Sequence, residues 1–89
     1  MDAPKVTLEH INETVTKAEF IQPEGTTLTI CILTLKNGTH IVESSACVCP
    51  ANFNKQIGQD IAYKNAIEKI WALEGYLLKQ KIWEESQNV

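Results

Sequence analysis

The dipeptide Asn37-Gly38, which separates two stretches rich in β-branched residues, is the feature that most constrains the fold of this 89-residue chain. Asn-Gly is the preferred centre of a two-residue hairpin turn, because both central positions of a type I′ turn require positive φ. The stretch before the turn alternates between two faces. Leu28, Ile30 and Ile32 form one face, and Thr27, Thr29 and Cys31 form the other. The sequence therefore predicts an antiparallel hairpin made by residues 26–35 and 39–48.

The residues before the hairpin predict a short helix and a further strand. Thr7 is suited to be a helix N-cap, and apolar side chains follow it at helical spacing. These side chains are Leu8, Ile11 and Val15. We expect a helix over residues 7–17, then a strand over residues 19–21 that ends at the turn 22–25. Together with the hairpin, this strand completes an antiparallel meander of three strands.

The second half of the chain predicts one long helix. From about residue 51 to residue 79 the apolar residues recur with the period of an α-helix, and Pro50 suits its first turn. Small residues spaced four apart would let the helix backbone lie close to the sheet. They are Gly58, Ala62 and Ala66. Gly75 weakens the middle of the helix by about 1 kcal/mol relative to alanine, and it marks a bend or a close approach.

These elements predict an α+β fold: a short N-terminal helix, a three-stranded antiparallel sheet and a long C-terminal helix packed on one face of the sheet. A chain of 89 residues has room for one domain. We expect a single domain over residues 1–89, with an ordered core at about 5–80 and a frayed C-terminal tail from Glu84.

Composition and charge are those of an ordinary globular protein. Hydrophobic residues make up 44% of the chain and charged residues 21%, which argues against disorder. The net charge of −3 gives no general attraction to nucleic acid or to an anionic membrane. The N-terminal stretch lacks the apolar segment of a secretory signal, and no apolar run approaches the roughly 20 residues of a membrane span. Three cysteines without such a signal indicate reduced thiols in a cytosol.

Four residues have side chains that bind zinc, but their spacing is not typical of a structural zinc site. They are Cys31, His40, Cys47 and Cys49. Structural zinc sites present their ligands as close pairs, and here only Cys47 and Cys49 lie close together. We therefore interpret the cysteines as small structural thiols and expect no metal ion and no cofactor. A metal site that spans the hairpin is the alternative.

The sequence contains no pattern that predicts an enzyme. His10 and His40 are the only histidines, and neither lies beside a nucleophile motif. The four glycines are scattered and form no phosphate-binding loop. A chain of this size also builds a deep active-site cleft with difficulty.

The element order is also that of the double-stranded RNA-binding domain. Those domains bind phosphates with a cluster of lysines at the start of the second helix, whereas residues 54–60 here hold one lysine and one aspartate. Nucleic-acid binding is therefore the second hypothesis. A third hypothesis is an oligomer that sequesters a cyclic-nucleotide immune signal. Its weak candidates for a binding pocket are Lys36, Lys64, Lys69 and Tyr63.

Two segments of the chain are more distinctive. They are residues 45–54 (SACVCPANFN), followed by Ile57-Gly58, and residues 66–78 (AIEKIWALEGYLL). They resemble a family of small tailed-phage accessory proteins, the phage "gp forty-nine / gene sixty-six" family, and the similarity covers about residues 5–79. Cys49 departs from that family, which tends to have an aspartate N-cap before the proline, and a thiol is a poor acceptor. The resemblance implies a phage or prophage origin and expression in the host bacterial cytoplasm, and it supplies no catalytic residues.

The leading hypothesis is a non-enzymatic phage protein that binds and inhibits a host protein or defence complex, for example as an anti-CRISPR protein. Phage accessory proteins of this size are commonly stoichiometric inhibitors. The long helix has more apolar surface than one sheet can cover, and Trp and Tyr dominate binding hot spots. We expect the partner to contact Trp71, Tyr76, Leu78 and Trp83. The alternatives are that these residues complete the protein's own core or join two copies in a homodimer.

Overall fold

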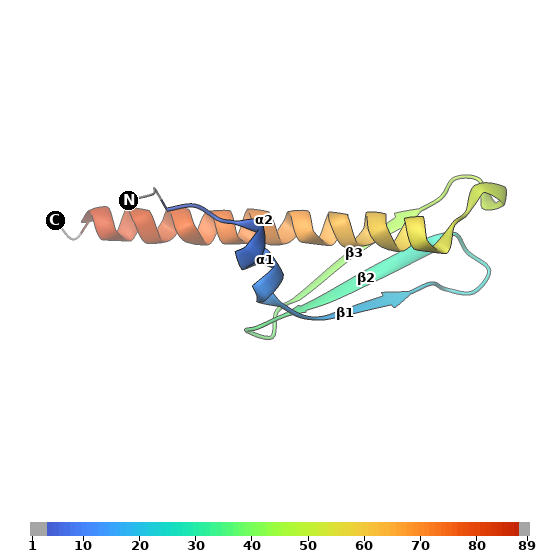
Figure 1. Ribbon diagram of the computed structural model, residues 1–89, viewed down its shortest axis with the longest axis horizontal. Coiled ribbons are helices and arrows are strands. Elements are labelled where there is room, and N and C mark those ends of the chain that lie inside the picture. Colours follow the sequence, from blue (N-terminus) through green and yellow to red (C-terminus); the bar gives the residue numbers. More distant parts are fainter. Residues whose placement is uncertain (1–3, 88–89) are drawn as a thin grey trace.

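The computed structural model describes residues 4–87 and contains one antiparallel sheet with a long helix on one of its faces (Figure 1). The strands lie in the order β1-β2-β3. In chain order the elements are α1 (Leu8–Thr14), β1 (Val15–Ile21), β2 (Leu28–Leu35), β3 (His40–Ala46), the 3-10 turn η1 (Pro50–Asn52) and α2 (Lys55–Gln87). This arrangement confirms the predicted α+β fold.

Helix α1 begins at the predicted residue and ends earlier than predicted. Thr7 Oγ1 accepts a hydrogen bond from the backbone N–H of His10 at 3.1 Å, which confirms the N-cap. The helix ends at Thr14, three residues before the predicted end, because Val15 already pairs with Leu35 of β2. Val15 is β-branched, and such residues favour strands. Strand β1 therefore begins four residues before the strand that the sequence predicts.

The β2–β3 hairpin lies at the predicted position, but its turn differs. Gly38 has a φ of +88° and Asn37 does not have a positive φ, so the predicted type I′ turn is wrong. Instead, the Gly38 N–H donates to the Leu35 carbonyl at 2.9 Å, and the Leu35 N–H donates to the Thr39 carbonyl at 2.8 Å. This geometry is a three-residue loop, Lys36-Asn37-Gly38, with glycine at the left-handed position. Asn37 contributes its side chain, whose Oδ1 accepts from the Thr39 N–H at 3.0 Å.

Helix α2 begins later than predicted. Pro50 opens the separate turn η1, and Cys49 before it makes no capping side-chain hydrogen bond. The Asn54 side chain instead accepts a hydrogen bond from the backbone N–H of Ile57 at 3.1 Å, so α2 begins at Lys55. Asparagine is a much better N-cap acceptor than a thiol, which explains why the long helix is capped by Asn54.

Helix α2 also ends later than predicted. It continues without interruption well past residue 79 and ends at Gln87. A side chain at Gly75 would meet no atom within 4 Å outside its own stretch of helix backbone, so of the two alternatives predicted for this glycine the close approach is wrong. The structure places residues 84–87 of the predicted tail in the helix, and residues 88–89 lie outside the described residues.

The core lies between α2 and the inner face of the sheet, which is the face that α2 covers. The buried apolar residues are Ile11, Cys31, Leu33, Leu35, Ile41, Ala62, Ala66 and Ile70. Ala62 and Ala66 are fully buried, and a methyl group at Gly58 would lie only 2.6 Å from Oγ1 of Thr29. The helix backbone therefore lies directly on β2 at this point, which confirms the role predicted for the three small residues.

Polar contacts hold α2 along β3 and against α1. Ser45 Oγ donates to the Gly58 carbonyl at 2.7 Å, and Asn65 Nδ2 donates to the Ser44 carbonyl at 3.1 Å. Lys69 forms an ion pair with Glu43 of β3. At the far end of the sheet, His10 Nε2 of α1 lies 3.1 Å from Glu74 Oε2 of α2. These contacts fix which part of the long helix lies over the sheet.

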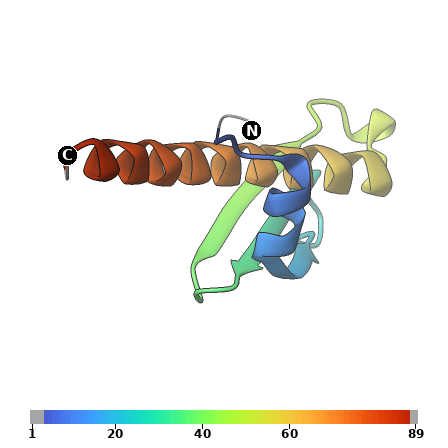
Figure 2. The same cartoon turned by 60° about the vertical axis from the view of Figure 1, so that its left-hand side comes forward.

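The molecule is elongated because α2 is about twice as long as the strands. At 1.5 Å per residue the helix is about 50 Å long, whereas an eight-residue strand is about 26 Å long. The molecule measures 60 × 23 × 19 Å, and its radius of gyration is 16.8 Å. A compact chain of this length would have a radius of gyration of about 12 Å. The C-terminal part of α2 therefore projects beyond the sheet (Figures 1 and 2).

Candidate protein-binding surface

The projecting part of α2 has little protein around it. Beyond Glu74, which contacts α1, the helix continues past the end of the sheet (Figure 2). Residues 4–6 run along one side of it and line two shallow hollows with Leu78 and Lys81. Large exposed apolar side chains gather on the rest of this part of α2, from Leu77, which borders the first hollow, round to the side that faces solvent.

We call this open surface the α2 stripe, and it consists of Leu73, Tyr76, Leu77 and Trp83. Their exposed fractions are 51%, 73%, 62% and 55%, respectively. The spacings of three, four and seven residues place them on one side of an α-helix, within an arc of about 120°. Four large apolar side chains therefore lie on one exposed side of the helix, which they share with the polar residues Gln80 and Glu84.

The structure divides the four predicted contact residues into two pairs. Tyr76 and Trp83 are seven residues apart, so they lie on one side of α2 within the stripe. Trp71 and Leu78 are also seven residues apart, but the two pairs are separated by about 140° around the helix. Leu78 is half-buried beside residues 4–6, and Trp71 is 36% exposed. One partner surface can contact Tyr76 and Trp83 together, but not all four side chains equally.

Leu73 and Leu77 of the stripe were not among the predicted contact residues. Both continue the helical row of Ile70, which is fully buried, so the sequence pattern favours core positions for them. They are exposed because the sheet ends before the helix does. The signal that could have identified them is the length of the predicted helix compared with that of the predicted strands.

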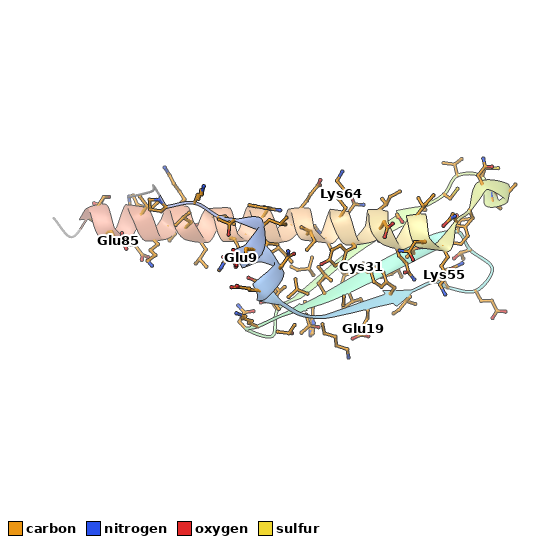
Figure 3. The ribbon with its side chains drawn as sticks, in the orientation of Figure 1. Glu9, Glu19, Cys31, Lys55, Lys64 and Glu85 are labelled. Atoms are coloured by element: carbon orange, nitrogen blue, oxygen red, sulfur yellow. The ribbon has the colours of Figure 1, made fainter. Side chains whose placement is uncertain are left out.

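The cysteines and the histidine of the hairpin do not meet. Cys31 is fully buried on the inner face of the sheet beneath α2 (Figure 3), whereas His40 pairs with Thr34 on the opposite face. Cys47 Sγ donates to the Cys49 carbonyl at 3.1 Å, and Cys49 is exposed. Within residues 4–87, no three His, Cys, Asp or Glu side chains are grouped closely enough to hold a metal ion.

The environments of the thiols predict a strong difference in reactivity. Burial raises the pKa of the Cys31 thiol and removes it from solvent, and the thiolate is the reactive form. We expect iodoacetamide to label Cys49 in the folded protein and to leave Cys31 unlabelled until denaturant is added. Peptide mapping by mass spectrometry before and after unfolding measures this difference. Equal labelling of Cys31 and Cys49 in the folded protein would show that the sheet is not covered as described.

The candidates for nucleotide and nucleic-acid binding are dispersed. Lys64 lies on the side of α2 turned away from the sheet (Figure 3), and Lys69 is paired with Glu43. Tyr63 is half-buried, with its ring centroid 6.5 Å from that of Phe20. The structure therefore does not bring these residues together into one pocket.

A hollow of about 350 Å³ lies where β3, η1 and the start of α2 meet. Its walls include Phe53, Ile57 and Ile61, together with neutral polar groups such as those of Ser45 and Asn52. None of the side chains that line it is charged. The walls of the hollow are therefore made of apolar and neutral polar groups.

Comparison with known proteins assigns the chain to a family. No curated protein and no solved structure matches it. Within residues 4–87, neither helix combines the length and the apolar composition needed to cross a membrane. The model of the phage protein (N4 Gp49/phage Sf6 gene 66) family matches residues 6–82, which include the whole sheet and nearly all of α2. The chain therefore belongs to the phage protein (N4 Gp49/phage Sf6 gene 66) family.

Proposed function

We propose that this phage protein is an accessory protein without catalytic activity that binds a host protein and thereby inhibits that protein or the defence complex that contains it. The observation that supports the proposal is the α2 stripe, in which four large exposed apolar side chains lie on one side of the projecting helix. Single exposed apolar residues are normal on protein surfaces, whereas contiguous ones mark interaction sites.

The stripe suits a partner with an apolar groove. Anchors that recur at three, four and seven residues on one helix are the pattern by which a groove holds an amphipathic helix. Tyr76 and Trp83 are of the residue types that dominate binding hot spots. The charged residues nearby balance in sign, so apolar contact would carry the affinity. They are Lys79, Lys81, Glu84 and Glu85.

The test is a pull-down with the tagged full chain from nuclease-treated host lysate, washed at low and at high salt. We expect one host protein to be retained in near-stoichiometric amount at both salt concentrations, because apolar contacts are not screened by salt. Replacing Trp83 with alanine should reduce its retention at least tenfold, since truncating a hot-spot residue costs about 2 kcal/mol or more. The activity of the purified host protein is then measured with the wild-type chain and with Trp83→Ala.

The matched control is Ile57→Ala, which removes an exposed apolar side chain from the opposite end of the same helix. This variant should capture and inhibit the host protein as the wild type does. Equal loss with Ile57→Ala and Trp83→Ala would move the binding site away from the α2 stripe. Recovery of nucleic acid alone, lost at high salt, would favour the nucleic-acid hypothesis instead.

A further inference from the structure

Strand β2 has three large apolar residues on its outer face, and a helix covers only its inner face. Leu28, Ile30 and Ile32 point away from α2 and alternate with the buried row on the inner face. An antiparallel strand with one solvated face normally alternates between apolar and polar residues, whereas a strand covered on both faces is apolar throughout. The composition of β2 is therefore that of a strand with a second covering layer. No helix of the described chain supplies that layer (Figure 1).

The two neighbouring strands extend this apolar surface. Ile21 of β1 lies opposite Ile30, and Val42 of β3 lies opposite Ile32. Ile21 is 46% exposed and Val42 is 54% exposed. We call the surface formed by Ile21, Leu28, Ile30, Ile32 and Val42 the outer sheet face. It lies on the other side of the sheet from α2, so it is separate from the α2 stripe.

The charges on the outer sheet face indicate what kind of partner it fits. Its charged side chains are Lys17 and Glu19 of β1, which form an ion pair at 3.0 Å. Glu19 points away from α2 (Figure 3). The face is therefore neutral, although the chain carries a net charge of −3. A neutral apolar face does not select a polyanion or an anionic membrane, and it lets two identical acidic chains meet without repulsion between their charges.

We propose that the outer sheet face binds a second copy of this chain in a two-fold symmetric dimer. The two sheets pack face to face at a separation of about 10 Å, with the α2 helices on the outside. A two-fold interface uses the same patch on both chains, so the two faces that meet carry the same balanced charges. The dimer carries two α2 stripes, and this inference does not depend on what the stripes bind.

The size of the face sets the expected strength of the dimer. Three strands of this length cover about 25 × 15 Å, which is a small footprint compared with the roughly 800 Å² that each partner buries in a standard interface. We therefore expect monomers and dimers in an equilibrium that depends on concentration. Sedimentation equilibrium from micromolar to near-millimolar protein should show the average mass rising from one chain toward two.

The variant that tests the interface is Val42→Lys, with Tyr76→Lys as its matched control. Both place a lysine at an exposed apolar position, the first on the outer sheet face and the second on the α2 stripe. Val42→Lys should stay monomeric throughout the range, while Tyr76→Lys dimerises as the wild type does. Far-UV circular dichroism establishes that each variant is folded, and Ile21→Lys replaces Val42→Lys if the latter unfolds.

Three results would overturn the proposal. The first is a wild-type chain that stays monomeric up to the highest concentration. The second is a folded Val42→Lys variant that dimerises as strongly as the wild type. The third is a Tyr76→Lys variant that is monomeric while Val42→Lys dimerises, which would place the dimer contact on α2 instead. None of these results depends on capture of a host protein, so this proposal and the proposed function can fail separately.

Discussion

Replacing Leu33 with alanine is expected to lower the free energy of unfolding by about 2–5 kcal/mol. Leu33 is fully buried at the centre of β2, between Ala18 on β1 and Ile41 on β3. Truncating it removes buried apolar surface and leaves a cavity that the surrounding sheet and helix can fill only in part. A domain of this size has a total stability of roughly 4–13 kcal/mol, so the variant loses a large fraction of it.

The same substitution at Leu77 is the matched control. Leu77 is 62% exposed on the α2 stripe, and alanine is at least as good a helix former as leucine. We expect Leu77→Ala to change the free energy of unfolding by about 0.5 kcal/mol or less. Urea denaturation followed by circular dichroism, at a fixed protein concentration, measures both values. A similar loss for the two variants would mean that Leu33 is not a core residue.

Replacing Gly58 with alanine is expected to lower the free energy of unfolding by about 1–3 kcal/mol, the usual cost of overpacking a well-packed contact. The added methyl group would lie 2.6 Å from Oγ1 of Thr29, and Thr29 is itself buried. Ser45 Oγ holds the Gly58 carbonyl at 2.7 Å, which limits how far the helix can move away from the sheet. Denaturation in urea again gives the value.

Two further variants isolate the cause of this loss. Truncating Thr29 to alanine removes the hydroxyl oxygen from the contact, so Gly58→Ala should cost much less in a Thr29→Ala background. Gly75 lies in the same helix, but a methyl group added there would meet no neighbouring side chain or strand within 4 Å. Gly75→Ala should therefore raise the free energy of unfolding by about 0.5–1 kcal/mol. An unchanged cost of Gly58→Ala in the Thr29→Ala background would rule out this steric contact as the cause.

The local parts of the fold were predictable because neighbouring residues determine them. The Thr7 cap depends on a hydrogen bond three residues along the chain, and the hairpin position depends on Asn37-Gly38 and the alternating residues around it. The turn type was not predictable from the dipeptide alone. The same residues also suit a three-residue loop in which only Gly38 adopts a positive φ, and here the pairing of Leu35 with Thr39 selects that loop.

The element boundaries that were wrong have two different causes, a contact between distant residues and a local cap. Val15 continues the apolar spacing of α1, yet it joins β1 because Leu35 of β2 lies opposite. Pro50 is well suited to begin a helix, yet Asn54 supplies the cap of α2. Helical spacing alone cannot distinguish between such alternatives, because the pairing of the sheet decides the first boundary and the Asn54 side chain decides the second.

The candidate site was predictable only in part for the same reason. The excess of apolar residues on the long helix, with its Trp and Tyr, pointed to an exposed band, and the structure places Tyr76 and Trp83 within it. Leu73 and Leu77 continue the helical row of the buried Ile70, and the sequence does not show where the sheet ends beneath the helix, so their exposure was not predictable. The apolar outer face of β2 is visible as alternation in the sequence, but alternation alone does not tell which row faces the helix.

The stretch of α2 from residue 75 to residue 87 lies beside residues 4–6 rather than on the sheet, so its order is weakly coupled to the cooperative unfolding of the core. A helix of that length is marginal in water without tertiary contacts. We therefore expect it to open locally at a smaller free energy than the whole domain unfolds. A partner that holds this stretch as a helix must therefore offset the entropy lost on ordering it, which lowers affinity for a given contact area. The same segment can therefore fit grooves of different length. In each complex it would be helical only as far as the groove extends.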